Sequence, residues 1–361
     1  MEKRKIFVIG HKNPDTDSVC SAIAYAQLKN EIDTENEYIP LRAGQTNEET
    51  QYVLKQFGVN APQYVMDVKS QVKDIEIRKV DGVDRNISIK AAWKLMRDIG
   101  VVTLPITRDN KLEGLITIAD IATSYMDVHD STTLSTARTV CKNIVETLDG
   151  ALIIGDEEHV FDRGKVLVAA ANPDLMESYI RMGDIVILGN RYESQLCAIE
   201  MQAGCIVVCE GAPVSMTIKK LAVENHCTII STPHDTFTAS RLINQSVPIS
   251  FFMRTEGLIT FSTEAYTDEV RQVMAKKRHR DFPIHDEQGN YIGMISRRNL
   301  LGAGKKKLIL VDHNERGQAV NGVETAEILE IIDHHRLGAI QTVSPVFFRT
   351  QPLGSTATII Y

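Results

Sequence analysis

Residues 6–18 read IFVIGHKNPDTDS, an apolar run that ends in glycine and is followed by one histidine and two aspartates. The run is typical of a buried parallel strand, because both faces of such a strand are apolar. His11, Asp15 and Asp17 then form either a polar turn before a helix or half of a metal site. The choice depends on whether other strands of the chain end in similar groups.

The segments that follow predict an open α/β sheet. Residues 18–30 carry apolar side chains at helical spacing, with Asp17 or Ser18 as the expected N-cap. Residues 37–44 predict a second strand, and residues 47–58 predict a helix that ends in glycine. Strands that alternate with helices in this way form parallel sheets.

Two segments near the other end of the sequence resemble the opening stretch. Residues 306–314 (KKLILVDHN) predict a strand, and residues 324–338 predict a helix followed by a strand. The histidines and acids that follow these strands are Asp312, His313, Asp333, His334 and His335. Ligands of open α/β sheets bind at the carboxyl ends of strands, so the three clusters are expected to meet in one crevice.

Three such clusters favour a metal site over isolated helix caps and isolated histidines. Histidine together with several carboxylates favours Mn²⁺, Co²⁺ or Zn²⁺ over Mg²⁺ at the protein ligands. Carboxylates can also bridge two ions about 3.5–4 Å apart, the arrangement used in phosphoryl hydrolysis. Metal binding lowers the pKa of water, which predicts a hydroxide between the ions as the nucleophile. A further Mg²⁺ is expected to arrive with a phosphate substrate.

Between these parts lies an internal repeat. Residues 73–126 and 250–301 share the order of a helix, an apolar-Pro-Ile strand, an acidic turn, a glycine with apolar neighbours and a second helix. Their cores read LPITRDNKLEGLITIADI and FPIHDEQGNYIGMISRRNL. The repeat resembles the CBS domain, whose paired copies bind adenine nucleotides. This resemblance implies nucleotide binding by the chain.

The CBS resemblance also implies particular contacts. Thr117 and Asp120 match the family's ribose-binding positions, whereas the second copy has Ser296 and Asn299, an amide in place of the carboxylate. Basic side chains before the second Phe-Pro strand are expected to meet phosphates, or else they form a solvated helix end. The expected nucleotide contacts are Gly100, Thr103, Thr117, Asp120, Met253, Arg278, His279, Arg280, Ser296 and Asn299.

Residues 130–246 predict a separate α/β unit. Four apolar strands, at residues 150–156, 165–171, 184–190 and 205–211, alternate with helices. The unit resembles the DRTGG domain, which occurs between CBS domains in a few enzymes. No catalytic set is evident in its sequence, so packing or dimerisation is the preferred interpretation.

The motifs GHKNPDTDS, VDHN and DHH, in this order, resemble the DHH phosphoesterases and, within them, the family II manganese-dependent inorganic pyrophosphatases. The implied metal ligands are His11 and Asp15 for one ion, Asp17 and His334 for the other, and Asp312 as the bridge. His335 and Asp333 are the expected catalytic residues: His335 contacts substrate phosphate, while Asp333, like His313, orients the ligands. Two Mn²⁺ or Co²⁺ ions per site, and Mg²⁺ with the substrate, are the expected cofactors.

These resemblances predict an open parallel-sheet DHH domain interrupted by a pair of CBS domains and a DRTGG domain. The predicted boundaries are 1–65 and 305–361 for the two parts of the DHH domain, 66–129 and 247–304 for the CBS domains, and 130–246 for the DRTGG domain. The family carries a further bridging aspartate and a basic substrate-binding domain after the last motif. Residues 336–361 contain neither, so the resemblance implies a chain truncated at its C-terminus.

The predicted function is a nucleotide-regulated inorganic diphosphatase, which hydrolyses pyrophosphate to two phosphates. The resemblance implies control by AMP, ADP, ATP and diadenosine polyphosphates, and a homodimer formed through the CBS domains. Two alternatives remain. One is a DHH phosphodiesterase or exopolyphosphatase, and the other is a nucleotide sensor without catalysis.

Composition limits the classes of partner. The net charge of -7 opposes a simple electrostatic surface for nucleic acid. No run approaches the roughly 20 apolar residues that span a bilayer. Six cysteines without CxxC pairs predict buried free thiols and a reducing cytoplasm. Neither nucleic acid nor a membrane is therefore an expected partner.

Overall fold

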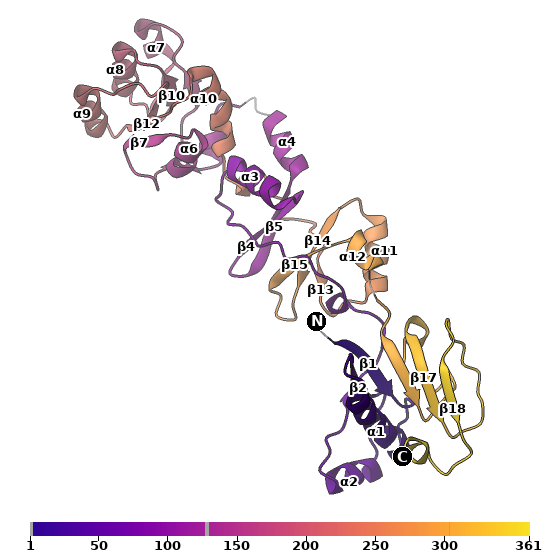
Figure 1. The fold of residues 1–361 in the computed structure, drawn as a ribbon. Helices are drawn as coiled ribbons and strands as arrows, with labels where there is room; N and C mark the ends of the chain where they lie inside the picture. Colours follow the sequence, from indigo (N-terminus) through magenta and orange to yellow (C-terminus); the bar gives the residue numbers. More distant parts are fainter. Residues whose placement is uncertain (1–2, 127–129, 303) are drawn as a thin grey trace. The chain divides into compact units, whose positions relative to one another are not determined.

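The structure, a computed structural model, describes residues 3–126, 130–302 and 304–361. The chain divides into two compact units (Figure 1). The first comprises Met1–Arg78, Phe261–Glu287 and Met294–Tyr361, and the second comprises Lys79–Thr260 and Gln288–Gly293. Each unit therefore combines parts of more than one predicted domain.

A six-stranded sheet forms the centre of the first unit. Its strands are β1 (Arg4–Ile9), β2 (Asn36–Arg42), β3 (Gln63–Tyr64), β16 (Lys307–Val311), β17 (Glu327–Asp333) and β18 (Phe347–Thr350). All are parallel, in the order β18-β17-β16-β1-β2-β3. The strand order therefore reverses between β1 and β16. Such a switch point leaves a crevice at the carboxyl ends of the two strands.

Alternating side chains of this sheet face two cores. On one face, Val8 packs with Ala22 of α1 (Thr16–Ile32) and Ile359 of α13 (Thr356–Ile360). On the other face, Ile9 and Leu310 pack with buried residues of the segment 319–326. Burial on both faces requires apolar side chains at successive positions, which is why the apolar runs predicted these strands.

The sheet confirms the predicted open parallel architecture, but two local predictions are wrong. The N-cap of α1 is Asp15, whose Oδ1 accepts a hydrogen bond from Ser18 N at 2.9 Å, so Asp17 lies inside the first turn. The helix predicted within residues 324–338 is only the short turn η4 (Val323–Thr325). The residues after it extend because they pair with β16 as strand β17.

The remaining elements of the first unit include the strands of a smaller sheet, in the order β13-β14-β15. They are α2 (Glu48–Gln56), η1 (Val72–Asp74), β13 (Phe261–Ser262), α11 (Thr267–Lys276), β14 (Asp281–His285) and α12 (Arg297–Leu301). Strand β15 (Tyr291–Ser296) contributes residues to both units.

The second unit begins with the first repeat, which contains α3 (Ile89–Ile99), β4 (Thr103–Arg108), β5 (Lys111–Thr117) and α4 (Ile118–Met126). Strands β4 and β5 form an antiparallel hairpin. Asp109 and Asn110 at its turn both have positive φ, which two-residue hairpin turns of type I′ require. The hairpin delivers the chain directly into α4.

A five-stranded sheet, in the order β7-β12-β11-β10-β9, forms the other part of the second unit. Its strands are β7 (Ala151–Ile154), β9 (Val166–Val168), β10 (Ile185–Leu188), β11 (Cys205–Val208) and β12 (Thr228–Ser231). Only β7 is antiparallel to its neighbour in this sheet. Strand β12 was not predicted, because its apolar run is only two isoleucines long.

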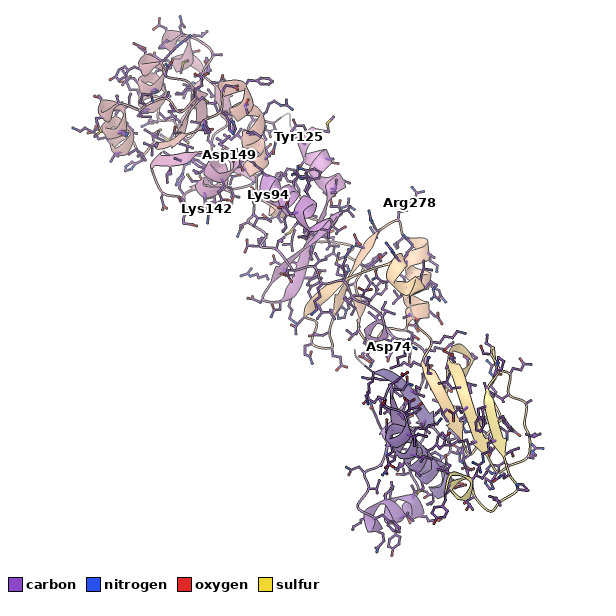
Figure 2. The ribbon with its side chains drawn as sticks, in the orientation of Figure 1. Asp74, Lys94, Tyr125, Lys142, Asp149 and Arg278 are labelled. Atoms are coloured by element: carbon purple, nitrogen blue, oxygen red, sulfur yellow. The ribbon has the colours of Figure 1, made fainter. Side chains whose placement is uncertain are left out.

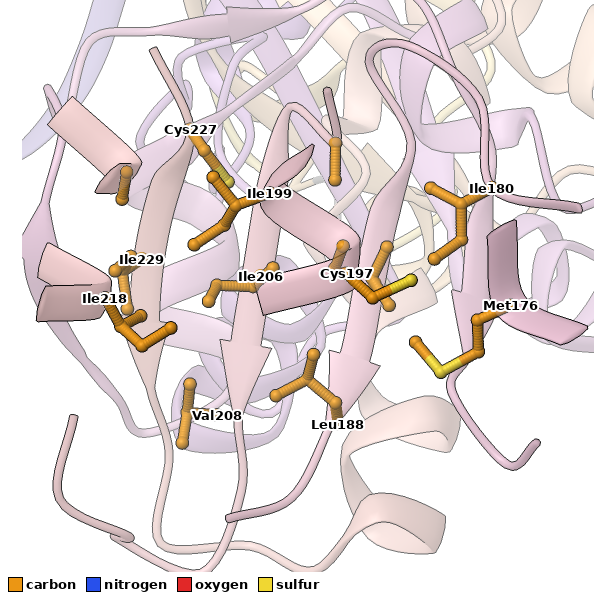
Figure 3. Close-up of a cluster of buried hydrophobic side chains, with 14 residues drawn as sticks. Met176, Ile180, Leu188, Cys197, Ile199, Ile206, Val208, Ile218, Cys227 and Ile229 are labelled. Atoms are coloured by element: carbon orange, nitrogen blue, oxygen red, sulfur yellow. The ribbon is translucent and has the colours of Figure 1, made fainter. Parts of the chain in front are cut away.

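Three helices pack on one face of this sheet: α7 (Pro173–Tyr179), α8 (Tyr192–Glu200) and α9 (Met216–Glu224). Figure 3 shows Ile206 and Ile229 of the strands beside Ile218 of α9 within one buried cluster. The other elements here are α5 (Thr133–Thr136), β6 (Thr139–Val140), α6 (Cys141–Thr147), β8 (Val160–Phe161), α10 (Thr236–Leu242), η2 (Ile243–Ser246) and η3 (Ile249–Phe251).

The cysteines are free, and five of the six are buried, as their apolar surroundings predicted. Burial raises the pKa of the Cys227 thiol to about 12, so this side chain stays protonated at neutral pH. Within the residues that the structure describes, no helix has both the length and the apolar content that a membrane span requires.

Truncation of Ile206 tests the buried cluster of the five-stranded sheet. Ile206 is fully buried, so Ile206→Ala is expected to cost about 2–5 kcal/mol of local stability through lost packing and a residual cavity. Native-state hydrogen exchange of the β10 and β11 amides measures this loss. Val223→Ala serves as the control, because the Val223 side chain is 57% exposed. Equal protection in the two variants would contradict the assigned core.

Candidate metal centre

The loop after β1 places three polar side chains at the carboxyl end of the large sheet. Gly10 brings this loop close to α1, since a Cβ at Gly10 would lie 1.9 Å from Ser18 Oγ. The same Ser18 Oγ accepts a hydrogen bond from His11 N at 3.1 Å. Asp15 caps α1, and Asp17 lies in its first turn. Backbone contacts thus hold all three predicted ligands of the opening motif.

Asp312 follows β16 directly and is 1% exposed. Its φ is +63°, a left-handed conformation that aspartate tolerates better than most residues. Asp312 N donates a hydrogen bond to the Ile332 carbonyl of β17 at 2.9 Å, and Asp312 Oδ1 accepts one from Thr356 Oγ1 at 2.9 Å. Asp312 Oδ2 is buried and has no hydrogen-bond partner of normal geometry among the described residues.

Two groups of possible metal ligands share Asp312: His11 with Asp15, and His334 with His335. On one side, His11 Nε2 lies 3.4 Å from Asp312 Oδ2 and 3.8 Å from Asp15 Oδ1. On the other side, His334 Nε2 lies 3.5 Å from Asp312 Oδ1 and 3.7 Å from Asp17 Oδ2. The two oxygens of Asp312 therefore face different histidines, Oδ2 facing His11 and Oδ1 facing His334. A carboxylate that bridges two ions requires this arrangement.

The charges of this centre fit divalent cations. Burial lowers the pKa of His11, but the adjacent Asp312 carboxylate and the charges of Asp15 and Asp333 outweigh it and raise that pKa above its ordinary value. Burial raises the pKa of Asp312, and the charges of Asp17 and Asp15 add to the rise. A divalent cation would relieve this crowding of carboxylates and would satisfy the orphaned oxygen of Asp312. The mixed histidine and carboxylate donors suit Mn²⁺ or Co²⁺.

A chain of hydrogen bonds holds His335 at the edge of the centre. His335 Nδ1 lies 2.8 Å from Asp333 Oδ1 and 3.8 Å from Asp312 Oδ1. Asp333 is fully buried, and its other oxygen accepts a hydrogen bond from the Asn314 amide. Asn314 also donates to the Arg336 carbonyl at 2.9 Å. Asp333 thus contacts His335 directly, the geometry that an orienting residue needs.

His313 points into the protein core and is fully buried. Its Nδ1 lies 2.9 Å from the Val311 carbonyl, and its ring meets the His11 ring edge to face at 6.4 Å between centroids. Burial lowers the pKa of His313 to about 4, so the side chain is neutral at pH 7. The structure therefore places His313 behind His11 as a packing partner.

Asn314 and Thr356 contact the site but were not among the predicted site residues. The backbone N atoms of Thr356 and Ala357, at the start of α13, donate to the Asp17 carboxylate at 2.7 and 2.9 Å. Only the position of Asn314, directly after an Asp-His pair at a strand end, could have drawn attention to it. The Gly-Ser-Thr stretch before α13 predicted a helix start, but it carried no sign of contact with Asp17 or Asp312.

In the second unit, the residues predicted to bind ribose lie together. Thr117 Oγ1 donates to Asp120 Oδ2 at 2.6 Å, and Thr103 pairs with Thr117 across β4 and β5. Met253 precedes Arg254, a residue that the sequence analysis did not single out. The Arg254 guanidinium donates from Nε and Nη2 to Asp120 Oδ1 at 3.0 and 2.7 Å.

The other predicted nucleotide contacts have local structural roles or are exposed. Gly100 ends α3 with a φ of +68°, which by itself favours glycine. In the first unit, Ser296 and Asn299 form the capping box of α12, with Ser296 Oγ 2.8 Å from Asn299 Oδ1. The basic residues 278–280 are exposed before β14, and Figure 2 labels Arg278 among them.

Comparison with known proteins identifies the parts of the chain. The CBS domain family matches residues 72–127 and 250–306, and the DRTGG domain family matches residues 143–246. The chain is 44% identical over 360 residues to a cobalt-dependent inorganic pyrophosphatase of Clostridium perfringens. It is 36% identical over 356 residues to a probable manganese-dependent inorganic pyrophosphatase of Thermotoga maritima. Both matches cover 99% of this chain and 65% of the relative's own length.

A solved structure supports the regulatory part of this comparison. It contains the CBS and DRTGG domains of the regulatory region of the Clostridium perfringens pyrophosphatase, complexed with the activator diadenosine tetraphosphate. The match has a TM-score of 0.61 at 37% sequence identity, and it covers 63% of this chain and 100% of that chain.

The fold and the paired ligand groups define an α/β protein with a two-sided candidate metal centre and an inserted CBS–DRTGG–CBS segment. By sequence, the chain is similar over nearly its whole length to manganese- and cobalt-dependent inorganic pyrophosphatases, the class that its motifs predicted, and it spans 65% of the length of these two relatives.

Mn²⁺ is expected to stabilise the first unit. Binding to the folded state alone adds RT ln(1 + [L]/Kd), about 2.7 kcal/mol at 100 times Kd. Scanning calorimetry of the full-length protein should show an unfolding midpoint that rises with Mn²⁺, and His334→Ala should abolish most of the rise. His226→Asn serves as the control, since the exposed His226 lies outside both ligand groups. An unchanged rise in His334→Ala would show that the ions bind elsewhere.

Proposed function

We propose that the protein is a manganese- or cobalt-dependent inorganic pyrophosphatase under the control of adenine nucleotides. The observation that carries this proposal is the two-sided Asp312, because a shared carboxylate is the feature that pairs two ions for phosphoryl hydrolysis. The names of the two curated relatives support the same reaction.

Each ligand group has a definite task in this proposal. His11 with Asp15 would hold one ion, Asp17 with His334 would hold the second, and Asp312 would lie between them. When bound, two divalent ions neutralise phosphoryl oxygens and make water a stronger nucleophile. The hydrogen bonds to Asp17 and Asp312 from α13 keep these carboxylates in place before any ion arrives.

A cavity of about 290 Å³ beside the centre fits a small anionic substrate. It is lined by His11, Lys12, Asn13, Gly317, Gln318 and His335. Lys12 brings positive charge to this cavity, and its backbone N is held by the Gln318 carbonyl at 2.8 Å. His335, which is hydrogen-bonded to Asp333 and lines the cavity, would contact a phosphate there. Mg²⁺ would accompany the pyrophosphate.

The regulatory part of the proposal assigns adenine nucleotides to the CBS repeats. AMP, ADP, ATP and diadenosine polyphosphates are the proposed ligands, and the complex of the similar regulatory region with diadenosine tetraphosphate supports this class. We also propose a homodimer through the CBS domains, a cytoplasmic location, and the five domain boundaries set out above.

Pyrophosphate hydrolysis tests the proposal directly. The full-length protein with Mn²⁺ or Co²⁺ should release phosphate from pyrophosphate, and His11→Ala should lower kcat/KM at least about 100-fold by weakening one ion site. His226→Asn should retain activity. Malachite-green detection of phosphate measures both variants.

Two outcomes would replace the proposed pyrophosphatase function with one of its alternatives. Faster hydrolysis of a dinucleotide or of polyphosphate than of pyrophosphate would favour the phosphodiesterase or exopolyphosphatase alternative. Tight nucleotide binding without any turnover would instead identify a sensor without catalysis.

Asn314 is expected to support the reaction through Asp333. In Asn314→Ala, one oxygen of the buried Asp333 loses its donor, so the His335 ring is less firmly oriented. We expect kcat/KM to fall about 10–100-fold, while the Mn²⁺-dependent rise of the unfolding midpoint persists. Wild-type kinetics in this variant, or loss of the Mn²⁺ response together with activity, would contradict the positioning role.

A further inference from the structure

The carboxylate of Asp120 is saturated with hydrogen-bond donors. Its Oδ2 accepts from Thr117 N at 2.9 Å and from Thr117 Oγ1 at 2.6 Å. Its Oδ1 accepts from Arg254 Nε at 3.0 Å and from Arg254 Nη2 at 2.7 Å. A carboxylate offers about four acceptor sites, so the described residues alone fill them. A ribose that binds Asp120 must therefore displace one of these donors.

Arg254 is the donor that can leave. Its backbone is fixed, because it exchanges two hydrogen bonds with Leu115 of β5, at 2.9 and 3.0 Å. A Cβ at Gly114 would lie 2.8 Å from the Arg254 carbonyl oxygen, so a glycine is needed for this close approach. The Arg254 side chain, by contrast, is 54% exposed, whereas that of Asp120 is 13% exposed. Water reaches the exposed guanidinium, so Arg254 can leave Asp120 when a ligand anion replaces the carboxylate as its partner, whereas release without a replacement loses the ion pair.

A cavity of about 440 Å³ lies beside this ion pair, within the size range of small-molecule sites. It is lined by Asp120, Thr123, Ser124, Thr133, Phe251, Phe252 and Arg254. The lining combines an acid for hydroxyl groups, aromatic rings for a flat base and a guanidinium for an anion. Asp120 belongs to the first CBS repeat and Arg254 to the second, so both repeats contribute to one cavity.

We propose that Arg254 is a specificity-determining residue that makes this cavity select phosphorylated nucleosides over free nucleosides. Without a ligand, the Arg254 guanidinium is hydrogen-bonded to the Asp120 carboxylate. When a ligand binds, its ribose hydroxyls donate hydrogen bonds to the Asp120 carboxylate in place of Arg254. The released guanidinium then pairs with the phosphate of the ligand. A nucleoside without phosphate breaks the same ion pair but offers Arg254 no new partner, so it binds more weakly. This inference rests on the proposed nucleotide regulation and deepens it.

Isothermal titration calorimetry of the full-length protein with AMP and with adenosine tests this exchange. The measured quantity is the ratio of the adenosine Kd to the AMP Kd. In Arg254→Met the ratio should fall at least about tenfold, because AMP loses a charge-assisted partner while adenosine no longer has to break the ion pair. Arg254→Lys keeps the charge without the planar fork and should give an intermediate ratio.

Arg108→Met is the matched control, since Arg108 is 71% exposed at the end of β4 and does not line the cavity. It should keep the ratio of the unaltered protein. An unchanged ratio in the Arg254 variants overturns the inference, and the Lys variant decides alone if the Met variant does not fold. Failure of the unaltered protein to bind AMP overturns the nucleotide assignment together with this inference. Nucleotide binding with the expected ratios but without pyrophosphate hydrolysis overturns only the proposed reaction.

Discussion

Asp312 lies at the point where the strand order of the parallel sheet reverses, between β1 and β16. Its two carboxylate oxygens face opposite sides of the crevice. Its position follows from the pairing of β1 with β16, in which Ile9 lies opposite Leu310. That pairing brings together motifs about 300 residues apart in sequence. The left-handed backbone at Asp312 and its contacts with Ile332 and Thr356 then fix the direction of the carboxylate. The other candidate ligands, on the loops after β1 and β17, lie around this carboxylate.

The inserted domains do not interrupt the strand pairing around Asp312, because the chain leaves the six-stranded sheet after β3 and rejoins it at β16. These strands belong to the same six-stranded sheet, so the insert connects two points of one framework. The CBS repeats contain a similar arrangement on a smaller scale. There, Asp120 of one repeat is held by Arg254 of the other, so one carboxylate again joins distant parts of the sequence.

Much of the site was predictable because strand ends and ligand types are local properties of the sequence. His11, Asp312 and His334 all follow apolar runs, and the rule that ligands bind at carboxyl ends was enough to group them. Asn314, Thr356 and Arg254 were not predictable in this way. Each of the three is connected to the proposed sites by a hydrogen bond to a residue that only the folded chain brings near. The extended conformation of β17 likewise depends on its partner β16 rather than on its own helix-like pattern.

Electron paramagnetic resonance of the full-length protein titrated with Mn²⁺ tests the shared carboxylate most directly. Two Mn²⁺ ions held by the shared carboxylate of Asp312 would lie close enough for their spins to couple, since ions in two-metal sites are about 3.5–4 Å apart. We predict a coupled spectrum once two ions are bound per chain, and loss of the coupling in Asp312→Asn. Spectra of isolated Mn²⁺ ions at the same loading of the unaltered protein would contradict a centre built around Asp312.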